Sequence, residues 1–260
     1  MTIPATLAQA ARRAVKTDPL FQDPALMRPK ARPQLRRYEV MSLLPNGDIA
    51  ETQHVAPALP LFENAFLAFC RGALVETDHG PVAVEDLLPG DRIVTGDGDA
   101  RPLLWIGSTR LAPRTGDSQR RHLTLTRIMA NNFGIGRPAA CVMAGPAARL
   151  KKTPAHLKAH AGAAPLLTPV AEFVDGMNVI ETNPPTPVQM FHLCLPRHAV
   201  IRVGGLEFET YHPGMTATRT ISHAMRSVYL NLFPHVDTMA DFGTPCHARA
   251  GDGEIDALSA

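Results

Sequence analysis

The sequence has few aromatic residues, little net charge and no long apolar run. Ten Phe, three Tyr and one Trp make 14 aromatic residues in a chain of 260. The net charge of +2 argues against a nucleic-acid-binding surface, because such surfaces concentrate basic residues. No apolar run reaches the length of about 18 residues that a membrane helix needs, so we expect no membrane span.

Cysteine is also scarce, and its spacing excludes the usual cysteine-based sites. Cys70, Cys141, Cys194 and Cys246 lie far apart and form no C-x-x-C pair. This spacing indicates free thiols that are mostly buried rather than a disulfide framework. The first residues lack the apolar core of a secretory signal, so a cytoplasmic location is the default expectation. Export by a non-classical route stays open.

Proline is abundant, at 24 residues, and 45% of the chain is hydrophobic. This composition predicts a packed core built from short strands and turns, because proline interrupts helices. Turn signals recur every 8–12 residues or so, which is typical of an all-β domain. We expect two strand-like runs within residues 72–87, joined by the turn at 78–81, and further strands at 91–95, 102–106, 122–126, 140–143, 179–181, 188–195, 199–203 and 206–210.

Segments of different character flank this β-rich region. Residues 1–60 form a basic N-terminal extension, with eight Lys or Arg against two acidic residues in 1–38. Asn46-Gly47 predicts a hairpin over 37–55, with both residues at positive φ. Residues 61–215 form the β-domain. Residues 216–260 form a C-terminal tail with a short helix near 222–233 and a polar end.

Several motifs stand in a fixed order along the β-domain. Gly72 opens a strand, Gly80-Pro81-Val82 and Val84-Glu85-Asp86-Leu87 follow, and then come Gly90-Asp91 and Trp105-Ile106-Gly107. The closing stretch FHLCLPRHAVIRVGGLEFETYHPG carries His192 and His198, a Gly204-Gly205 turn and a final Pro-Gly. In this order the motifs resemble the Hint (hedgehog/intein) domain family, in its bacterial branch, over about 150 residues.

The resemblance implies a small all-β horseshoe of short strands and hairpins. It also implies self-cleavage, in which a Cys or Ser attacks the preceding carbonyl and a histidine of a Ser/Thr-Pro-x-His-Arg motif protonates the leaving nitrogen. The frame positions of this resemblance are Gly72, Asp86, Gly90, Asp91, His192 and His198. It implies no cofactor and no metal.

The sequence departs from the family at the nucleophile. Counting back four residues from Gly72 reaches Ala68, which carries no nucleophilic group. Cys70 lies two residues further on. In an extended strand that shift keeps the face but moves the side chain by about 6.5 Å, whereas acyl transfer needs reacting atoms about 3–3.5 Å apart.

The second motif departs as well. Gly145-Pro146-Ala147-Ala148-Arg149 aligns with Ser/Thr-Pro-x-His-Arg, so Gly145 replaces the hydroxyl and Ala148 the histidine. Thr153-Pro154-Ala155-His156 offers a displaced alternative. The catalytic candidates that remain are therefore Cys70 and His156.

Three hypotheses follow from these residues. The leading one is a degenerate Hint domain that serves as a non-catalytic scaffold or interaction module for an unknown protein partner. The second is residual autoproteolysis by an N-to-S acyl shift at Cys70. The third is a metal-binding β module using His192, Cys194 and His198, with His212 as a fourth ligand. No small-molecule substrate is evident.

Overall fold

The computed structural model describes residues 34–112, 124–158, 164–214 and 222–251. Most of the basic arm, the start of the strand expected at 122–126 and the last nine residues lie outside these ranges. Within them, no helix is both long and apolar enough to span a membrane.

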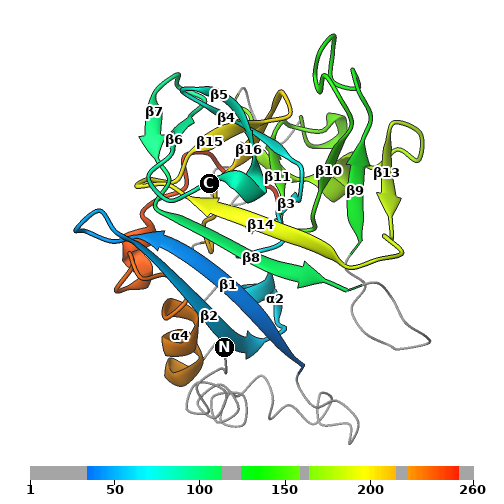
Figure 1. Ribbon diagram of the computed structural model, residues 1–260. Coiled ribbons are helices and arrows are strands. Elements are labelled where there is room, and N and C mark those ends of the chain that lie inside the picture. The colour runs from blue at the N-terminus through cyan, green and yellow to red at the C-terminus, as the bar shows by residue number, and fades with distance from the viewer. Residues whose placement is uncertain (1–33, 113–123, 159–163, 215–221, 252–260) are drawn as a thin grey trace, which may run out of the picture.

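The structure is built almost entirely from short strands, which confirms the all-β prediction (Figure 1). The strands are β1 (Leu35–Leu43), β2 (Ile49–Pro57), β3 (Phe69–Cys70), β4 (Leu74–Thr77), β5 (Gly80–Ala83), β6 (Arg92–Val94), β7 (Ala100–Pro102), β8 (Trp105–Leu111), β9 (Leu125–Ile128), β10 (Val142–Ala144), β11 (Arg149–Lys151), β12 (Leu167–Pro169), β13 (Val179–Thr182), β14 (Val188–Cys194), β15 (Val200–Val203) and β16 (Leu206–Glu209). The α-helices are α2 (Pro60–Glu63) and α4 (His223–Leu230). Short 3-10 turns cover Val84–Asp86, Ala155–Leu157, Val170–Phe173 and Met239–Phe242.

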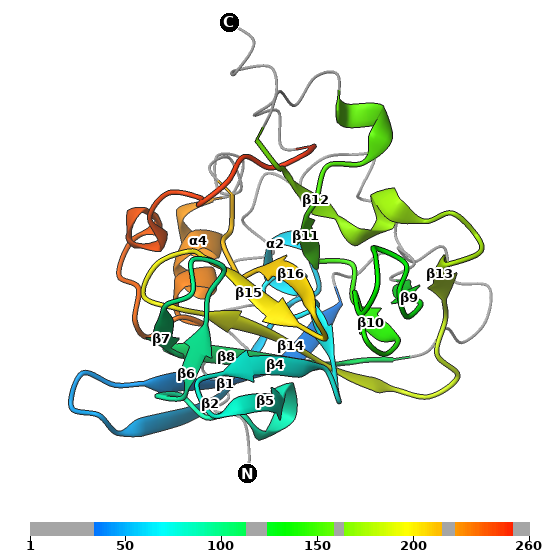
Figure 2. The same ribbon diagram turned by 90° about the horizontal axis from the view of Figure 1, so that it is seen from above.

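Two antiparallel sheets organise these strands. The first has the order β13-β9-β10-β3-β14-β8-β1-β2, and the second has the order β12-β11-β16-β15-β4-β6-β7, with β5 paired to β4. Figure 2 shows the long strands β8, β14, β1 and β2 along one side and the short hairpin β15–β16 beside them. The chain crosses repeatedly between the sheets, so residues distant in sequence meet at β3, β10, β11 and β14.

The two glycine turns behave differently. Gly204 and Gly205 both take positive φ between β15 and β16, as a tight hairpin requires. In the β1–β2 hairpin only Gly47 does, at φ 89°, so the prediction of positive φ at Asn46 is wrong. The physical reason is a longer loop: Leu43 pairs with Ile49, and Gly47 donates to the Leu44 carbonyl.

A hydrophobic core joins the N-terminal hairpin to the C-terminal segment. Tyr38 and Phe66 from the N-terminal side pack with Trp105, Tyr229 and Phe233, and all five are fully buried. The Trp105 ring stacks on Phe233, and its indole N–H donates to the Leu232 carbonyl at 2.7 Å. Burying side chains of this size stabilises the fold by about 1.5–3 kcal/mol each. The hairpin also extends the first sheet, because β1 pairs with β8.

One pair of strands is absent from those expected from the sequence. Leu167–Pro169 forms β12 and pairs with β11 before the 3-10 turn Val170–Phe173 begins. Leu166, Leu167 and Thr168 are buried. Burial of this short apolar run explains the strand, since a neighbouring strand satisfies its backbone groups.

Candidate functional site

The two backbone segments that the sequence aligns with the family's catalytic motifs lie against each other. The Gly145 N–H donates to the Ala68 carbonyl at 2.7 Å, and the Ala147 N–H donates to the Leu67 carbonyl at 3.0 Å. With the second motif aligned at Gly145–Ala148, these hydrogen bonds place the motif next to the peptide bond that precedes Ala68. This bond occupies the place of the scissile bond in the alignment that the sequence suggested.

Ala68 and Ala148, the alanines that the sequence aligns with the chemical positions, are buried in one apolar cluster. Ala68 is 0% exposed and Ala148 2% exposed, and they share this cluster with Phe69, Phe191 and Phe208. Neither side chain offers a nucleophile, an acid or a base. The space that would hold the reacting groups is therefore part of the hydrophobic core.

Gly145 is in direct contact with the chain before Ala68. A Cβ atom on Gly145 would lie 2.1 Å from the Leu67 carbonyl oxygen and 2.8 Å from its carbon. Real Cβ atoms do not approach backbone atoms this closely. A Ser or Thr at this position would therefore require the backbone to move.

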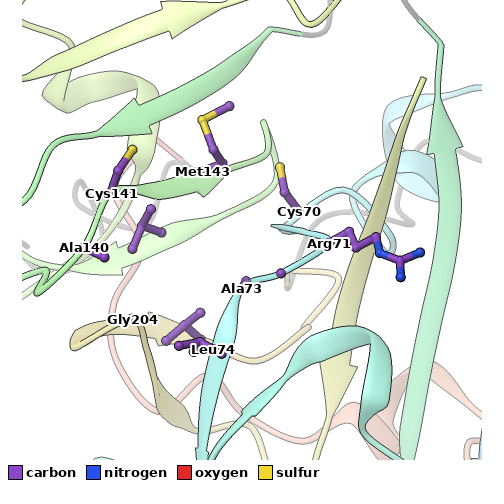
Figure 3. A pocket seen from close by; sticks show the side chains of 11 residues that line it. Cys70, Arg71, Ala73, Leu74, Ala140, Cys141, Met143 and Gly204 are labelled. Carbon is purple, nitrogen blue, oxygen red and sulfur yellow. The ribbon is translucent and has the colours of Figure 1, made fainter. Parts of the chain in front are cut away.

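Cys70 lies beside this site in a different environment. It is 5% exposed, its thiol donates to the Met190 sulfur at 3.5 Å, and burial raises its pKa to about 12. The residue borders a pocket of about 170 Å³ that also includes Cys141 and Met143 (Figure 3). A thiol with this pKa is protonated at neutral pH, which makes it a poor nucleophile.

The expectation that Ala68 and Cys70 share one face is wrong. Ala68 and Phe69 lie in the same apolar cluster, whereas Cys70 lies in a separate cluster with Leu67 and Met190. The strand here is only two residues long, Phe69–Cys70, so the alternation of an extended strand does not reach back to Ala68. Moving the thiol from position 68 to position 70 therefore changes its surroundings as well as its place along the chain.

His156 is not brought to Cys70. It lies in the 3-10 turn Ala155–Leu157, its side chain is 59% exposed, and its imidazole is 3.6 Å from the Glu172 carboxylate. The Cys70 side chain is buried, and its thiol hydrogen-bonds to the Met190 sulfur. The two catalytic candidates thus occupy separate parts of the structure and have different partners.

A buried ionic cluster, which sequence reasoning did not identify, lies near the second motif. Glu209 is within 3.0 Å of the Arg249 guanidinium, 3.4 Å of His198 and 3.5 Å of Arg149. Burial raises the pKa of Glu209, but the hydrogen bond from His198 and the positive charge of Arg249 outweigh that effect and hold it below its usual value. A cavity of about 110 Å³ separates this cluster from Ala147.

The members of this cluster come from distant parts of the sequence. Glu209 stands inside the closing motif, but nothing in the sequence alone assigns it a partner. Arg249 is the only basic residue in the last 24, and it bonds Glu209 and the His212 carbonyl. A single basic residue in an acidic segment is the one sequence signal that could have identified Arg249 as a member of this cluster.

The proposed His-Cys-His metal set is dispersed. His192 is 2% exposed, its ring packs edge-on against Tyr211, and burial lowers its pKa to about 3. Cys194 lies in the cluster around Trp105, and His198 bonds the Thr210 carbonyl and the Cys246 N–H. His212, the expected fourth ligand, bonds the Gly243 carbonyl. Among the described residues, no group of three His, Cys, Asp or Glu side chains is placed to hold a metal ion.

The remaining frame residues lie in turns of the backbone. Gly72 has φ 85°, and its N–H donates to the Glu85 carboxylate at 2.7 Å. Gly90 has φ 103°, and the Asp91 carboxylate accepts from the Leu88 N–H at 2.8 Å. Asp86 ends the 3-10 turn that follows β5. These residues stabilise turns of the backbone, and none of them is at position 68 or 148.

Comparison with known structures finds intein-like proteins. A bacterial intein-like domain from Clostridium thermocellum is 12% identical, covers 56% of this chain and 99% of its own, and has a TM-score of 0.39. The MchDnaB-1 intein is 15% identical, covers 55% of this chain and 100% of its own, and has a TM-score of 0.30. These values are too low to support an argument about activity. No curated protein matches the sequence.

The sequence profile of a protein family gives the firmer result. The Hint domain profile matches residues 67–215, which is more than half of the chain. The match begins one residue before Ala68 and ends one residue after Gly214, so it includes both chemical positions and the closing hairpin. The chain therefore belongs to the Hint domain family.

Proposed function

We propose that this protein is a Hint domain that does not cleave itself and that acts as a scaffold or interaction module. The observation that carries the proposal is the packing of Gly145 against the Leu67 carbonyl. A family member with a hydroxyl side chain here needs room for it beside the scissile bond. In this chain a backbone carbonyl fills that room, and the site is shaped for glycine.

The loss of the reacting groups supports the same proposal. Acyl transfer from Leu67 would require a nucleophile at position 68 and a proton donor near its nitrogen. Ala68 and Ala148 supply neither, and both are buried among apolar side chains. The contributions of catalytic groups that act as a unit are not additive, so losing one group removes most of the reaction rate. Once the nucleophile is lost, little selection remains to keep the histidine.

Residual cleavage at Cys70 is the alternative to test. It would use the Phe69 carbonyl and a thiol whose pKa is raised to about 12. The histidine proposed to assist this cleavage, His156, is paired with Glu172 on the surface. The geometry therefore supports an uncleaved chain over this alternative.

The test is the intact mass of the full-length protein under denaturing conditions, with and without dithiothreitol. We expect one species at 28.1 kDa in the wild type and in the matched Cys70→Ala variant. Fragments from a cut before residue 70, present in the wild type and absent from Cys70→Ala, would overturn the proposal. A cut before residue 68 that persists in Cys70→Ala would overturn it as well.

A further inference from the structure

Sulfur atoms from neighbouring strands gather around Cys70. Met190 on β14 is the direct antiparallel partner of Cys70 on β3, and their sulfur atoms are 3.5 Å apart. Both side chains are buried in one apolar cluster. The central strand therefore holds a thiol with a thioether already in contact on one side.

A second methionine lies on the other side of Cys70. Ala144 on β10 pairs with Phe69 on β3, and the same antiparallel register continued by one residue places Met143 opposite Cys70. Met143 packs against the cluster that contains Cys70 and Met190. Directly opposed side chains on adjacent strands have Cβ atoms about 4.5–5.5 Å apart. Met143, Cys70 and Met190 therefore form a row across β10, β3 and β14, which we call the sulfur row.

The spacing between the Cys70 and Met190 sulfurs suits a soft metal ion. Metal–sulfur bonds of about 2.3 Å in a trigonal plane put the sulfur atoms about 4 Å apart. The Cys70 and Met190 sulfurs are already 3.5 Å apart, so binding requires them to separate by a fraction of an ångström. Methionine side chains are flexible enough to supply that movement.

The apolar surroundings of the sulfur row favour a monovalent ion. Leu67, Leu111 and Leu125 share the apolar cluster of Cys70 and Met190, and the described residues that line the pocket include one charged side chain, the cationic Arg71, and no carboxylate. A monovalent cation bound to one thiolate gives a neutral complex. A divalent cation bound to the same thiolate would leave a net positive charge in an apolar environment, which is costly. Thiolate and thioether ligands also prefer Cu(I) over harder metals.

The sulfur row can be reached from solvent. Cys70 and Met143 line the pocket of about 170 Å³, and the exposed Cys141 lies in the same pocket. In Figure 3 the sulfur atoms of Cys70, Met143 and Cys141 all lie toward the upper side of the view, away from Ala73 and Leu74. The pocket therefore connects Cys70 and Met143 with the exposed Cys141.

We propose that Cys70, Met143 and Met190 form a binding site for one Cu(I) ion. Binding forms three copper–sulfur bonds, and the Cys70 thiol releases its proton to solvent. No electron is transferred, because copper enters already reduced. The affinity rises with pH, since the thiol must lose its proton.

The experiment is an anaerobic titration of the reduced full-length protein with Cu(I), using bathocuproine disulfonate as a competing chromophoric chelator. We expect one equivalent to bind to the wild type and Cys70→Ala to lose that equivalent. Met143→Leu and Met190→Leu should each weaken binding by more than about tenfold, since even outer residues of metal sites contribute that much. Cys246→Ala, at an exposed cysteine outside the sulfur row, is the matched control and should bind as the wild type does.

Two results would overturn the proposal. One is a wild-type protein that leaves all Cu(I) with the chelator. The other is a Met143→Leu, Met190→Leu double variant that binds as tightly as the wild type. This double variant conserves side-chain volume, so its circular dichroism should match the wild type and a loss of binding cannot be ascribed to unfolding. Displacement of Cu(I) by an excess of Zn²⁺ would also contradict the soft-ligand argument.

Discussion

Replacing Gly145 with alanine tests the packing on which the proposed function rests. The new Cβ would lie 2.1 Å from the Leu67 oxygen and 2.5 Å from the Met190 methyl carbon. The methionine can move aside, but the carbonyl is held by the Ala147 N–H at 3.0 Å. Relief of the clash therefore requires a backbone shift and the loss of that hydrogen bond.

The size of the effect follows from these contributions. Overpacking costs about 1–3 kcal/mol, and the lost hydrogen bond costs about 1 kcal/mol. Gly145 does not have a positive φ, so alanine also gains about 0.4–1 kcal/mol by restricting the unfolded chain. We expect the free energy of unfolding to fall by about 1–3.5 kcal/mol in total.

The assay is urea unfolding followed by the fluorescence of Trp105, the only tryptophan. The transition midpoint should fall while the slope stays unchanged. Gly96→Ala is the matched control, because a Cβ there meets its nearest neighbours at an ordinary 3.5 Å and the φ is not positive. A Gly145→Ala variant as stable as Gly96→Ala would refute the argument that position 145 is closed to side chains.

Two further predictions concern the buried cluster and the C-terminal segment. Glu209→Gln should lower the free energy of unfolding by about 3–5 kcal/mol at pH 7, because it leaves buried cations without their counter-charge. The folded-state pKa of Glu209 is depressed, so its contribution is present above the unfolded value of about 4.3 and is lost as pH falls through the folded value. Urea midpoints below pH 5 should therefore fall more steeply in the wild type than in Glu209→Gln, and parallel pH profiles would contradict the assignment. Phe233→Ala should cost about 3–5 kcal/mol and shift Trp105 emission to longer wavelength, because Phe233 stacks on that indole; an unchanged spectrum would argue against that packing.

Much of the fold could be predicted because its signals are local. The Gly204-Gly205 turn, the alternating strands and the ordered motifs each depend on residues close in sequence. The Hint frame also predicted the alignment of Ala68 and Ala148 with the chemical positions, which stays a prediction.

The parts that could not be predicted depend on strand order and distant packing. The sulfur row exists because β3 lies between β10 and β14, and nothing in the sequence near Cys70 reports those neighbours. Arg249 reaches Glu209 from 40 residues away. The turn of the chain at Ala68, which separates it from Cys70, arises because β3 is too short to impose strict alternation.

The shared core of the N-terminal hairpin and the C-terminal segment bears on how this chain would behave if it were cut. β1 hydrogen-bonds to β8, Phe66 packs against Trp105 across the break, and α4 covers the same core. A break near Ala68 would remove one covalent link but none of these contacts. The pieces would remain a nicked, native-like complex, and fragments divided at this point should reassemble when mixed. The chain is therefore suited to fragment complementation.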